Sequence, residues 1–179
     1  LVANGHIDEE IGRVQPKISF RQPALLFRND GRGRFVNASA AAGPDLFRPA
    51  VARGAAYADI DHDGDLDVLI STNHGPASLY RNDGGNANRW LTLKLEGEKS
   101  NRSGLGATVR LESAGGRQWQ TVHSGSSYCS QSDLALTFGL GKDETANLEI
   151  QWPSGARQTF SNVKSNRLLR IHESRGIVP

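Results

Sequence analysis

The sequence lacks the features that would build a membrane protein, a disulfide scaffold or a long helix. Its single cysteine, Cys129, excludes an internal disulfide. No apolar run approaches membrane-spanning length, and no charged segment followed by an apolar one marks a secretory leader. No long segment repeats its apolar residues with the helical period. With 20 glycines, short apolar runs and frequent turn signals, the chain is predicted to be all-β.

The charge is divided unevenly along the chain. Residues 1–88 carry 9 Lys or Arg and 11 Asp or Glu, whereas residues 89–179 carry 12 and 8. The basic residues are dispersed and are not interleaved with aromatics, so no nucleic-acid partner is expected. An apolar fraction of 37% and a mean hydropathy of −0.48 suit a soluble globular protein without membrane insertion. Cys129 is expected to act as a small buried apolar residue.

The most informative segment is the acidic run Asp59–Asp67. Five carboxylates alternate with other residues over nine positions, with Gly64 among them. Charges packed this closely repel one another unless a cation lies between them. Carboxylate oxygens in a flexible loop suit calcium better than a transition metal, and the glycine allows the sharp turn around the ion. The run therefore predicts a bound Ca²⁺; the alternative is an acidic, solvated turn without metal.

The loop does not follow the EF-hand template, which ends in a bidentate glutamate at its twelfth position. Counted from Asp59, that position is Ile70. The residues on either side, 54–58 and 68–70, are typical of strands. The segment is therefore predicted to be a β-hairpin whose turn holds the metal. The predicted metal residues are Asp59, Asp61, Asp63 and Asp67 through their side chains, and Asp65 through its backbone carbonyl.

An internal repeat surrounds this loop. Residues 23–31 (PALLFRNDG) return as residues 76–84 (PASLYRNDG), a spacing of 53 residues, within the range of propeller blades. Each copy ends in Asn-Asp-Gly, a turn signal. In this alignment residues 7–20 are an insertion, read as a packed surface loop. The chain is predicted to begin just after an earlier calcium loop, so that other blades or chains cover the blade edges.

Residues 89–179 are predicted to form a second domain of about seven short strands, a β-sandwich or small barrel. The preceding residues 1–88 form the propeller segment, about one blade and part of a second. Alternation places Trp90 and Trp119 in the core of the second domain. The polar segment Gly125–Asp133 is either a structural loop with Tyr128 packed inward or a loop that faces a ligand. The predicted strands are 90–95, 108–111, 118–123, 134–138, 147–152, 157–160 and 168–172.

Taken together, these motifs resemble two known families. The acidic run, the Leu-Tyr-Arg-Asn-Asp-Gly turn and the segment Asn4-Gly5-His6 resemble FG-GAP/VCBS repeats, which build integrin-α-like propellers. The segments 101–107, 125–128, 131–133, 138–141 and 151–155 resemble the ASPIC/UnbV domain that closes proteins of the cartilage acidic protein type. Cys129 departs from this pattern, where an aliphatic residue is expected.

The resemblance implies an extracellular or periplasmic protein with calcium-stabilised blades and no catalytic machinery. The favoured function is thus a non-catalytic interaction or adhesion module that binds a protein or a glycan. One alternative is a glycan-binding or glycan-active protein, which as a hydrolase would need a pair of facing carboxylates. A purely structural cap for a propeller is the other alternative. The candidate carboxylates outside the loop are Asp133, Glu112, Glu149 and Asp45; Ser126, His123 and Asp133 supply the residue types of a triad without a nucleophile elbow.

Overall fold

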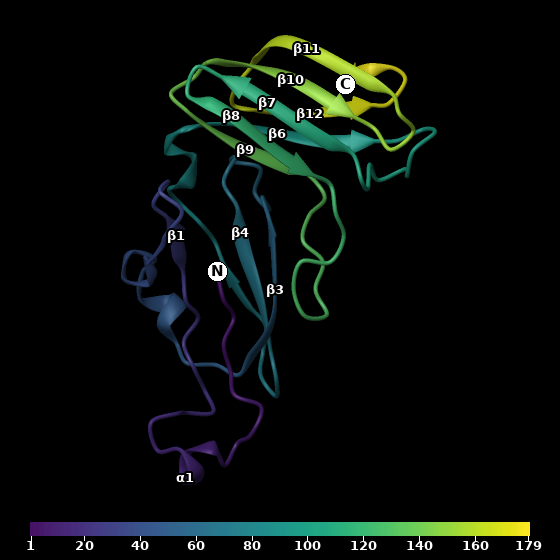
Figure 1. The fold of residues 1–179 in the computed structure, drawn as a ribbon. Helices are drawn as coiled ribbons and strands as arrows, with labels where there is room; N and C mark the ends of the chain where they lie inside the picture. The colour runs from purple at the N-terminus through teal and green to yellow at the C-terminus, as the bar shows by residue number, and fades with distance from the viewer. The chain divides into compact units, whose positions relative to one another are not determined.

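The computed structural model covers residues 1–179 and consists mainly of β-strands and turns (Figure 1). This confirms the predicted all-β class. The chain forms two compact units, each with its own apolar core. The domain boundary that the sequence predicts, between residues 88 and 89, stays a prediction. The first unit comprises residues 1–57, 67–81 and 125–131, and the second comprises residues 58–66, 82–124 and 132–179.

The first unit contains two small sheets. Strands β1 (Phe27–Asn29) and β2 (Phe35–Asn37) pair antiparallel, as the turn signal between them predicts. Strands β3 (Ala52–Ala58), β4 (Asp67–Thr72) and β5 (Ser78–Tyr80) form a three-stranded sheet in that order. Figure 1 shows β3 and β4 side by side. These strands agree with the predicted hairpin and with a segment of FG-GAP type.

Short helical turns connect the strands of the first unit. Helix α1 (Ile11–Val14) is a single turn inside the insertion at residues 7–20, and its Ile11 is buried while most neighbouring residues are exposed. Two 3₁₀ turns follow, η1 (Ser39–Ala41) and η2 (Pro44–Phe47). The small core of this unit consists of Ala24, Leu46, Ala52 and Ile70, of which Leu46 lies in η2.

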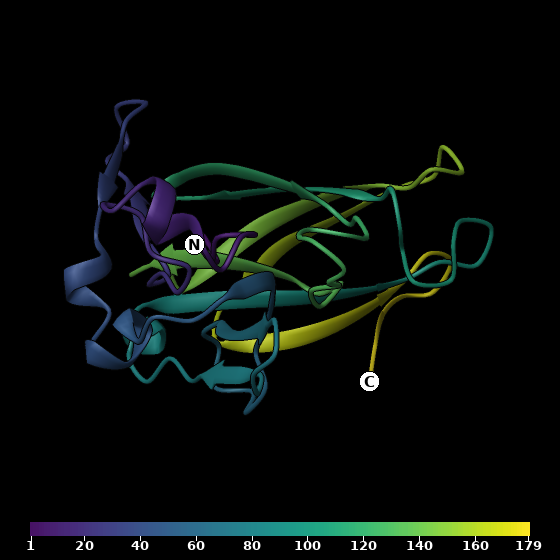
Figure 2. The same ribbon diagram turned by 90° about the horizontal axis from the view of Figure 1, so that it is seen from below.

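The second unit is a sandwich of two four-stranded sheets, in the orders β11-β10-β7-β8 and β13-β12-β6-β9. Figure 2 shows the two layers of the sandwich. The predicted sandwich or barrel is therefore an open sandwich. All its strand pairs are antiparallel except β12 with β6. The strands are β6 (Arg89–Glu96), β7 (Thr108–Ser113), β8 (Gly116–Thr121), β9 (Leu136–Gly141), β10 (Thr145–Gln151), β11 (Arg157–Lys164), β12 (Arg167–His172) and β13 (Gly176–Val178), with the 3₁₀ turn η3 (Gly85–Ala87) ahead of them.

Alternation along the strands builds the core of this sandwich. Val109 and Leu111 of β7 and Leu148 and Ile150 of β10 are buried, whereas the residues between them are more exposed. This is the period expected when one face of each sheet packs inward. Trp152 is the largest fully buried side chain, and its indole N–H donates to Gln158 Oε1 at 2.9 Å. The seven predicted strands are all present; β13 was not predicted.

The edge of the sandwich between β8 and β9 is closed by glutamine side chains. The Gln118 and Gln120 amides donate to the backbone oxygens of Gly139 and Thr137 on β9, at 2.7 and 2.8 Å. These bonds occupy carbonyls that an edge strand would otherwise present to solvent. Trp119 lies between them in sequence, points to the other face and is 74% exposed. Its predicted place in the core is wrong, because the inward positions of β8 hold the two glutamines.

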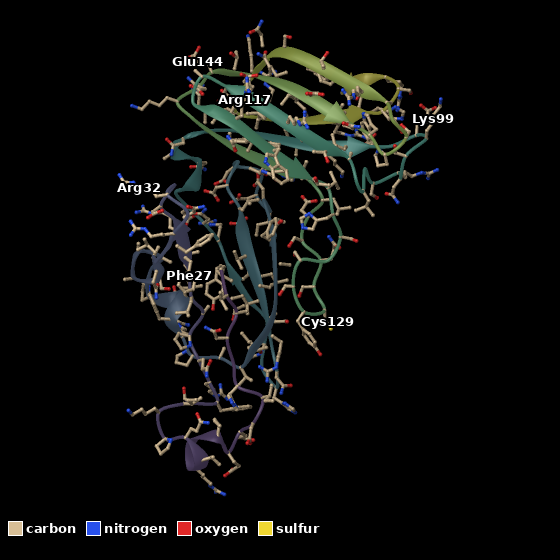
Figure 3. All side chains as sticks on the ribbon, viewed as in Figure 1. Phe27, Arg32, Lys99, Arg117, Cys129 and Glu144 are labelled. Atoms are coloured by element: carbon tan, nitrogen blue, oxygen red, sulfur yellow. The ribbon has the colours of Figure 1, made fainter.

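The segment Gly125–Gln131 packs within the first unit. The Ser127 hydroxyl accepts a hydrogen bond from the Ala55 N–H of β3 at 3.1 Å. Tyr128 is 69% exposed and Cys129 is also exposed, as the label at the end of this loop in Figure 3 shows. The predictions of a buried cysteine and an inward-packed tyrosine are therefore wrong. Cys129 has a positive φ of 46°, in the left-handed region that is uncommon for residues other than glycine.

Candidate metal centre

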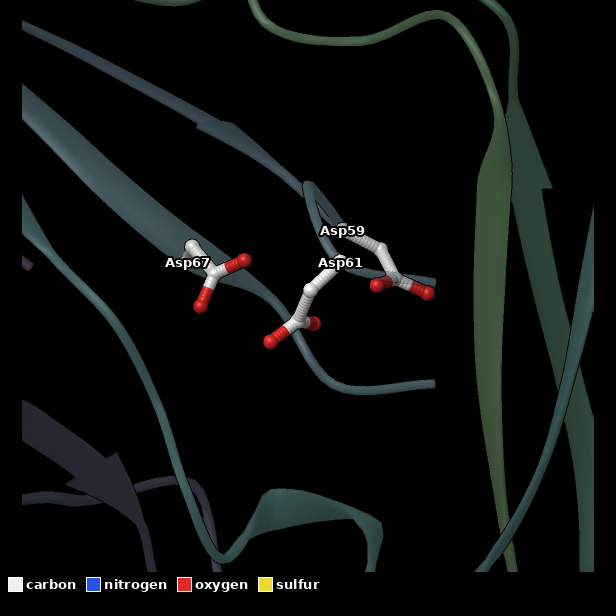
Figure 4. Close-up of side chains that lie close together, drawn as sticks. All are labelled: Asp59, Asp61 and Asp67. Carbon is white, nitrogen blue, oxygen red and sulfur yellow. The ribbon is translucent and has the colours of Figure 1, made fainter. Parts of the chain in front are cut away.

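The acidic loop connects the end of β3 to the start of β4 and brings three carboxylates together. Asp59 follows β3, Asp61 is exposed within the loop, and Asp67 opens β4 with 1% exposure. One oxygen from each lies within 4.8 Å of the others. Figure 4 shows the three side chains close together at the turn of the hairpin. The hairpin thus places an all-oxygen donor set at its turn.

These three donors fit a calcium ion in their chemistry. Ca²⁺ takes oxygen ligands at about 2.3–2.6 Å, so two oxygens on opposite sides of the ion are about 5 Å apart. The three oxygens lie within 4.8 Å of one another, close enough to bind one such ion together. When bound, a calcium ion would neutralise the charge that the three carboxylates concentrate in the turn.

The other two predicted metal residues make hydrogen bonds that shape the loop. Asp63 Oδ1 accepts from the Asp65 N–H at 3.1 Å, and its Oδ2 accepts from the Asn86 amide at 2.8 Å. Asp65 Oδ2 accepts from the N–H groups of Gly85 and Asn86, at 3.0 and 3.2 Å. Both side chains therefore connect the loop to η3. The ligand set proposed from sequence divides here into three converging carboxylates and two that fix the loop.

Asp59 contributes to the loop shape as well as to the converging cluster. Its two carboxylate oxygens accept from the N–H groups of Asp63 and Gly64, at 3.1 and 3.0 Å. Asp61, in contrast, makes no hydrogen bond of this kind within the loop, and it is exposed. Asp61 is thus the carboxylate whose removal tests cation binding with the least effect on the loop itself.

Position 64 requires a glycine because of its backbone conformation and because of the nearby Trp90 side chain. Its φ is +100°, a conformation that side chains of L-residues rarely adopt. A Cβ built on it would lie 1.8 Å from the Trp90 ring. The half-buried indole of Trp90 therefore covers the turn of the acidic loop. Trp90 is not among the residues of the sandwich core, so its predicted place there is wrong.

The carboxylates considered for hydrolysis are engaged elsewhere. Glu112 pairs with Arg117 at 3.0 Å, Glu149 lies 3.8 Å from Arg110, and the exposed Asp45 pairs with Arg48 at 2.7 Å. Asp133 accepts a hydrogen bond from the Ala135 N–H at 3.2 Å. His123 Nδ1 lies 3.0 Å from the backbone oxygen of Thr121. Each of these four carboxylates is thus paired with an arginine or accepts a backbone hydrogen bond.

Glu173 is a buried carboxylate that the sequence reasoning missed. Its Oε2 accepts from the N–H groups of Glu98, Lys99 and Ser100, at 2.6, 2.8 and 2.8 Å. Its Oε1 accepts from the hydroxyls of Ser100 and Ser154, at 2.8 and 2.5 Å. Burial raises the pKa of Glu173, but these hydrogen bonds outweigh the effect and hold its pKa at about 2, below the ordinary 4.5. The side chain fixes the loop that follows β6.

The comparisons with known proteins agree with this fold and loop. Residues 18–70, which include the acidic run, match the family model of the FG-GAP-like repeat. Residues 97–178, most of the sandwich, match the family model named ASPIC and UnbV. The resemblance drawn from the motifs is therefore confirmed for both parts of the chain. No helix of the structure combines the length and the apolar character needed to cross a membrane.

Individual relatives share part of this chain. It is 35% identical to cartilage acidic protein 1 of Xenopus tropicalis over 108 residues, which are 57% of this chain and 16% of that protein. It is 32% identical to cartilage acidic protein 1 of Homo sapiens over 126 residues, 67% of this chain and 18% of that protein. The Mus musculus protein of the same name is 30% identical, over 66% of this chain and 19% of its own length. The chain thus spans less than a fifth of these relatives.

Proposed function

We propose that this chain is a non-catalytic, calcium-binding interaction module of an extracellular or periplasmic protein. The observation that carries the proposal is the convergence of the Asp59, Asp61 and Asp67 carboxylates at one hairpin turn. The match of the same segment to FG-GAP-like repeats supports it. Asp63 and Asp65 complete the site by holding the loop against η3.

The metal would act structurally in this module. Without a cation, the three carboxylates repel one another at short range and strain the connection between β3 and β4. With calcium bound, the turn becomes an ordered, charge-neutral link between two strands. An extracellular or periplasmic location suits this role, because calcium modules in such compartments work with dissociation constants of about 10⁻⁴–10⁻³ M. The partner of the module is a protein or a glycan.

Thermal unfolding with added calcium or with chelator tests the proposal. A ligand at 100 times its dissociation constant stabilises the folded state by about 2.7 kcal/mol, which for a chain of this size raises the Tm by roughly 5–10 °C. We expect that rise for the parent and its loss in Asp61→Asn. Asp45→Asn, an exposed aspartate outside the loop, is the matched control and keeps the full response.

Two results would contradict the calcium site. One is a parent protein whose Tm is the same in calcium and in chelator. The other is an equal response of the parent and Asp61→Asn, which would place any calcium effect elsewhere. Because Asp61 makes no loop hydrogen bond, a lower Tm of Asp61→Asn in chelator is not expected and would indicate that the side chain has a structural role.

A further inference from the structure

The sandwich carries a groove that the acidic loop does not contribute to. Its volume is about 670 Å³, and all the residues lining it belong to the second unit. It is formed by the end of β6, the following loop at residues 97–103, the segment ahead of β9 at residues 133–135, and the turn after β12. Leu95 and Leu134 contribute apolar surface to its lining. This volume lies within the range of about 300–1,000 Å³ that is usual for small-molecule sites.

Basic side chains without ion-pair partners distinguish this groove. Lys94, Arg102 and Arg175 line it, are exposed, and take part in none of the salt bridges of the structure, unlike most other arginines of the sandwich. One acid of the lining, Glu96, is already bound by Arg170 at 2.6 Å, and this hydrogen bond lowers its pKa. The groove therefore offers an incoming ligand three cationic side chains that form no salt bridge within the protein.

Two carboxylates of the lining remain available as hydrogen-bond acceptors. Glu98 is exposed and makes no ion pair through its side chain, and Asp133 uses one oxygen to accept from the Ala135 N–H. His172 adds a ring whose Nδ1 lies 3.3 Å from the Ser174 N–H. The lining thus combines cations with hydrogen-bond acceptors, which suits a ligand that carries both acidic groups and hydroxyl donors.

The walls of the groove are fixed before any ligand arrives. Glu173 holds the N–H groups of residues 98–100, and Gly97 donates to the backbone oxygen of Arg102 at 3.2 Å. The Gln158 amide donates to the backbone oxygens of His172 and Glu173, at 3.0 and 2.8 Å. Since the backbone is already ordered, binding costs less conformational entropy than it would in a mobile loop.

We propose that this groove binds an acidic oligosaccharide through the uronate groups of its sugars. The guanidinium groups of Arg102 and Arg175 and the ammonium of Lys94 pair with sugar carboxylates. Glu98 and Asp133 accept hydrogen bonds from the sugar hydroxyls. Glu98 and Asp133 repel the carboxylates of any acidic ligand, and a chain of consecutive acidic amino acids fits less well because its side chains offer them no hydroxyl in compensation. The proposal goes beyond the calcium-dependent function, since it uses no residue of the acidic loop.

Titration followed by amide NMR tests the groove directly. The probe is a tetrasaccharide of alternating glucuronic acid and N-acetylglucosamine; its methyl ester has the same shape without the charge. We expect shifts of the amides of Gly97, Ser103 and Ala135, and at least tenfold weaker binding of the ester. Titrations in chelator keep the result independent of calcium, so that failure of the calcium site and failure of the groove are distinguishable.

Variants then identify the groups that bind. Arg102→Gln and Arg175→Gln should each weaken binding of the tetrasaccharide about tenfold, because each removes one charge-assisted contact. Arg117→Gln, an exposed arginine of β8 labelled in Figure 3, is the matched control and should bind as the parent does. Equal binding of the acid and its ester would overturn the proposal. So would absence of binding, or binding of tetraglutamate as tight as that of the sugar.

Discussion

Replacement of Glu173 by glutamine would test how strongly one buried carboxylate holds the sandwich together. Glu173 is 6% exposed and accepts five hydrogen bonds from the loop after β6 and from Ser154. In Glu173→Gln the amide keeps one acceptor oxygen but turns an NH₂ donor toward groups that are donors themselves. The hydrogen bonds to one of the two carboxylate oxygens are therefore lost, and the buried NH₂ group of the glutamine faces N–H or O–H donors of the loop.

The size of the effect follows from the pKa of this group. A folded-state pKa of about 2 against an ordinary 4.5 corresponds to about 3 kcal/mol of stability at neutral pH. Because the folded pKa is the lower one, this stability is present above about pH 4.5 and is lost as the pH falls toward 2. At pH 3 about 2 kcal/mol of it is already gone. We expect Glu173→Gln to cost about 3 kcal/mol at pH 7 and about 1 kcal/mol at pH 3.

Urea denaturation at the two pH values, followed by tryptophan fluorescence and circular dichroism, measures this difference. Trp152 reports on the region, because its indole binds Gln158, which in turn binds the backbone of Glu173. Glu112→Gln, which removes an exposed carboxylate paired with Arg117, should change the free energy of unfolding by less than about 1 kcal/mol at either pH. A cost of Glu173→Gln that is the same at pH 7 and pH 3 would refute the reasoning.

Three further substitutions test packing that the sequence did not reveal. Gly64→Ala should lower the free energy of unfolding by about 2–3 kcal/mol, since it combines a strained positive φ with a clash against the Trp90 ring; an unchanged midpoint in urea would contradict the contact. Gln120→Ala should cost about 1 kcal/mol through its lost bond to β9, whereas Trp119→Ala at the exposed neighbouring position should stay within about 0.5 kcal/mol. Chemical denaturation that ranks the two in the opposite order would rule out the edge-closing role of the glutamine.

Local pattern explains what could be read from the sequence. The strands of the sandwich alternate apolar and polar residues because each has one face against the core, as in Val109 and Leu111 of β7. The acidic hairpin was predictable because its converging carboxylates lie within nine positions of one another. Strand β13 escaped prediction because it has only three residues, too few to establish a period.

The prediction from alternation of apolar and polar residues was wrong on the edge strand β8. On β8 the tryptophan was assigned inward because large aromatics usually fill cores. The structure places glutamines inward instead, because the neighbouring edge of β9 presents backbone carbonyls that need donors. The sequence does contain a signal for this arrangement. Gln118 and Gln120 are two residues apart on one strand, so their side chains share one face and Trp119 lies on the other.

The groove and the hydrogen bonds of Glu173 could not be predicted from local sequence, because each joins residues that are far apart in the chain. Glu173 contacts Ser100 across 73 positions of sequence, and the groove joins residues from 94 to 175. The parallel pairing of β12 with β6 causes this convergence, because it brings the ends of two distant strands to the same edge of the sandwich. His172 lies opposite Glu96 in that register. The proposed binding surface is thus a consequence of topology: Arg102 and Asp133 lie in segments recognisable from the sequence, but their spacing does not reveal that they line one groove.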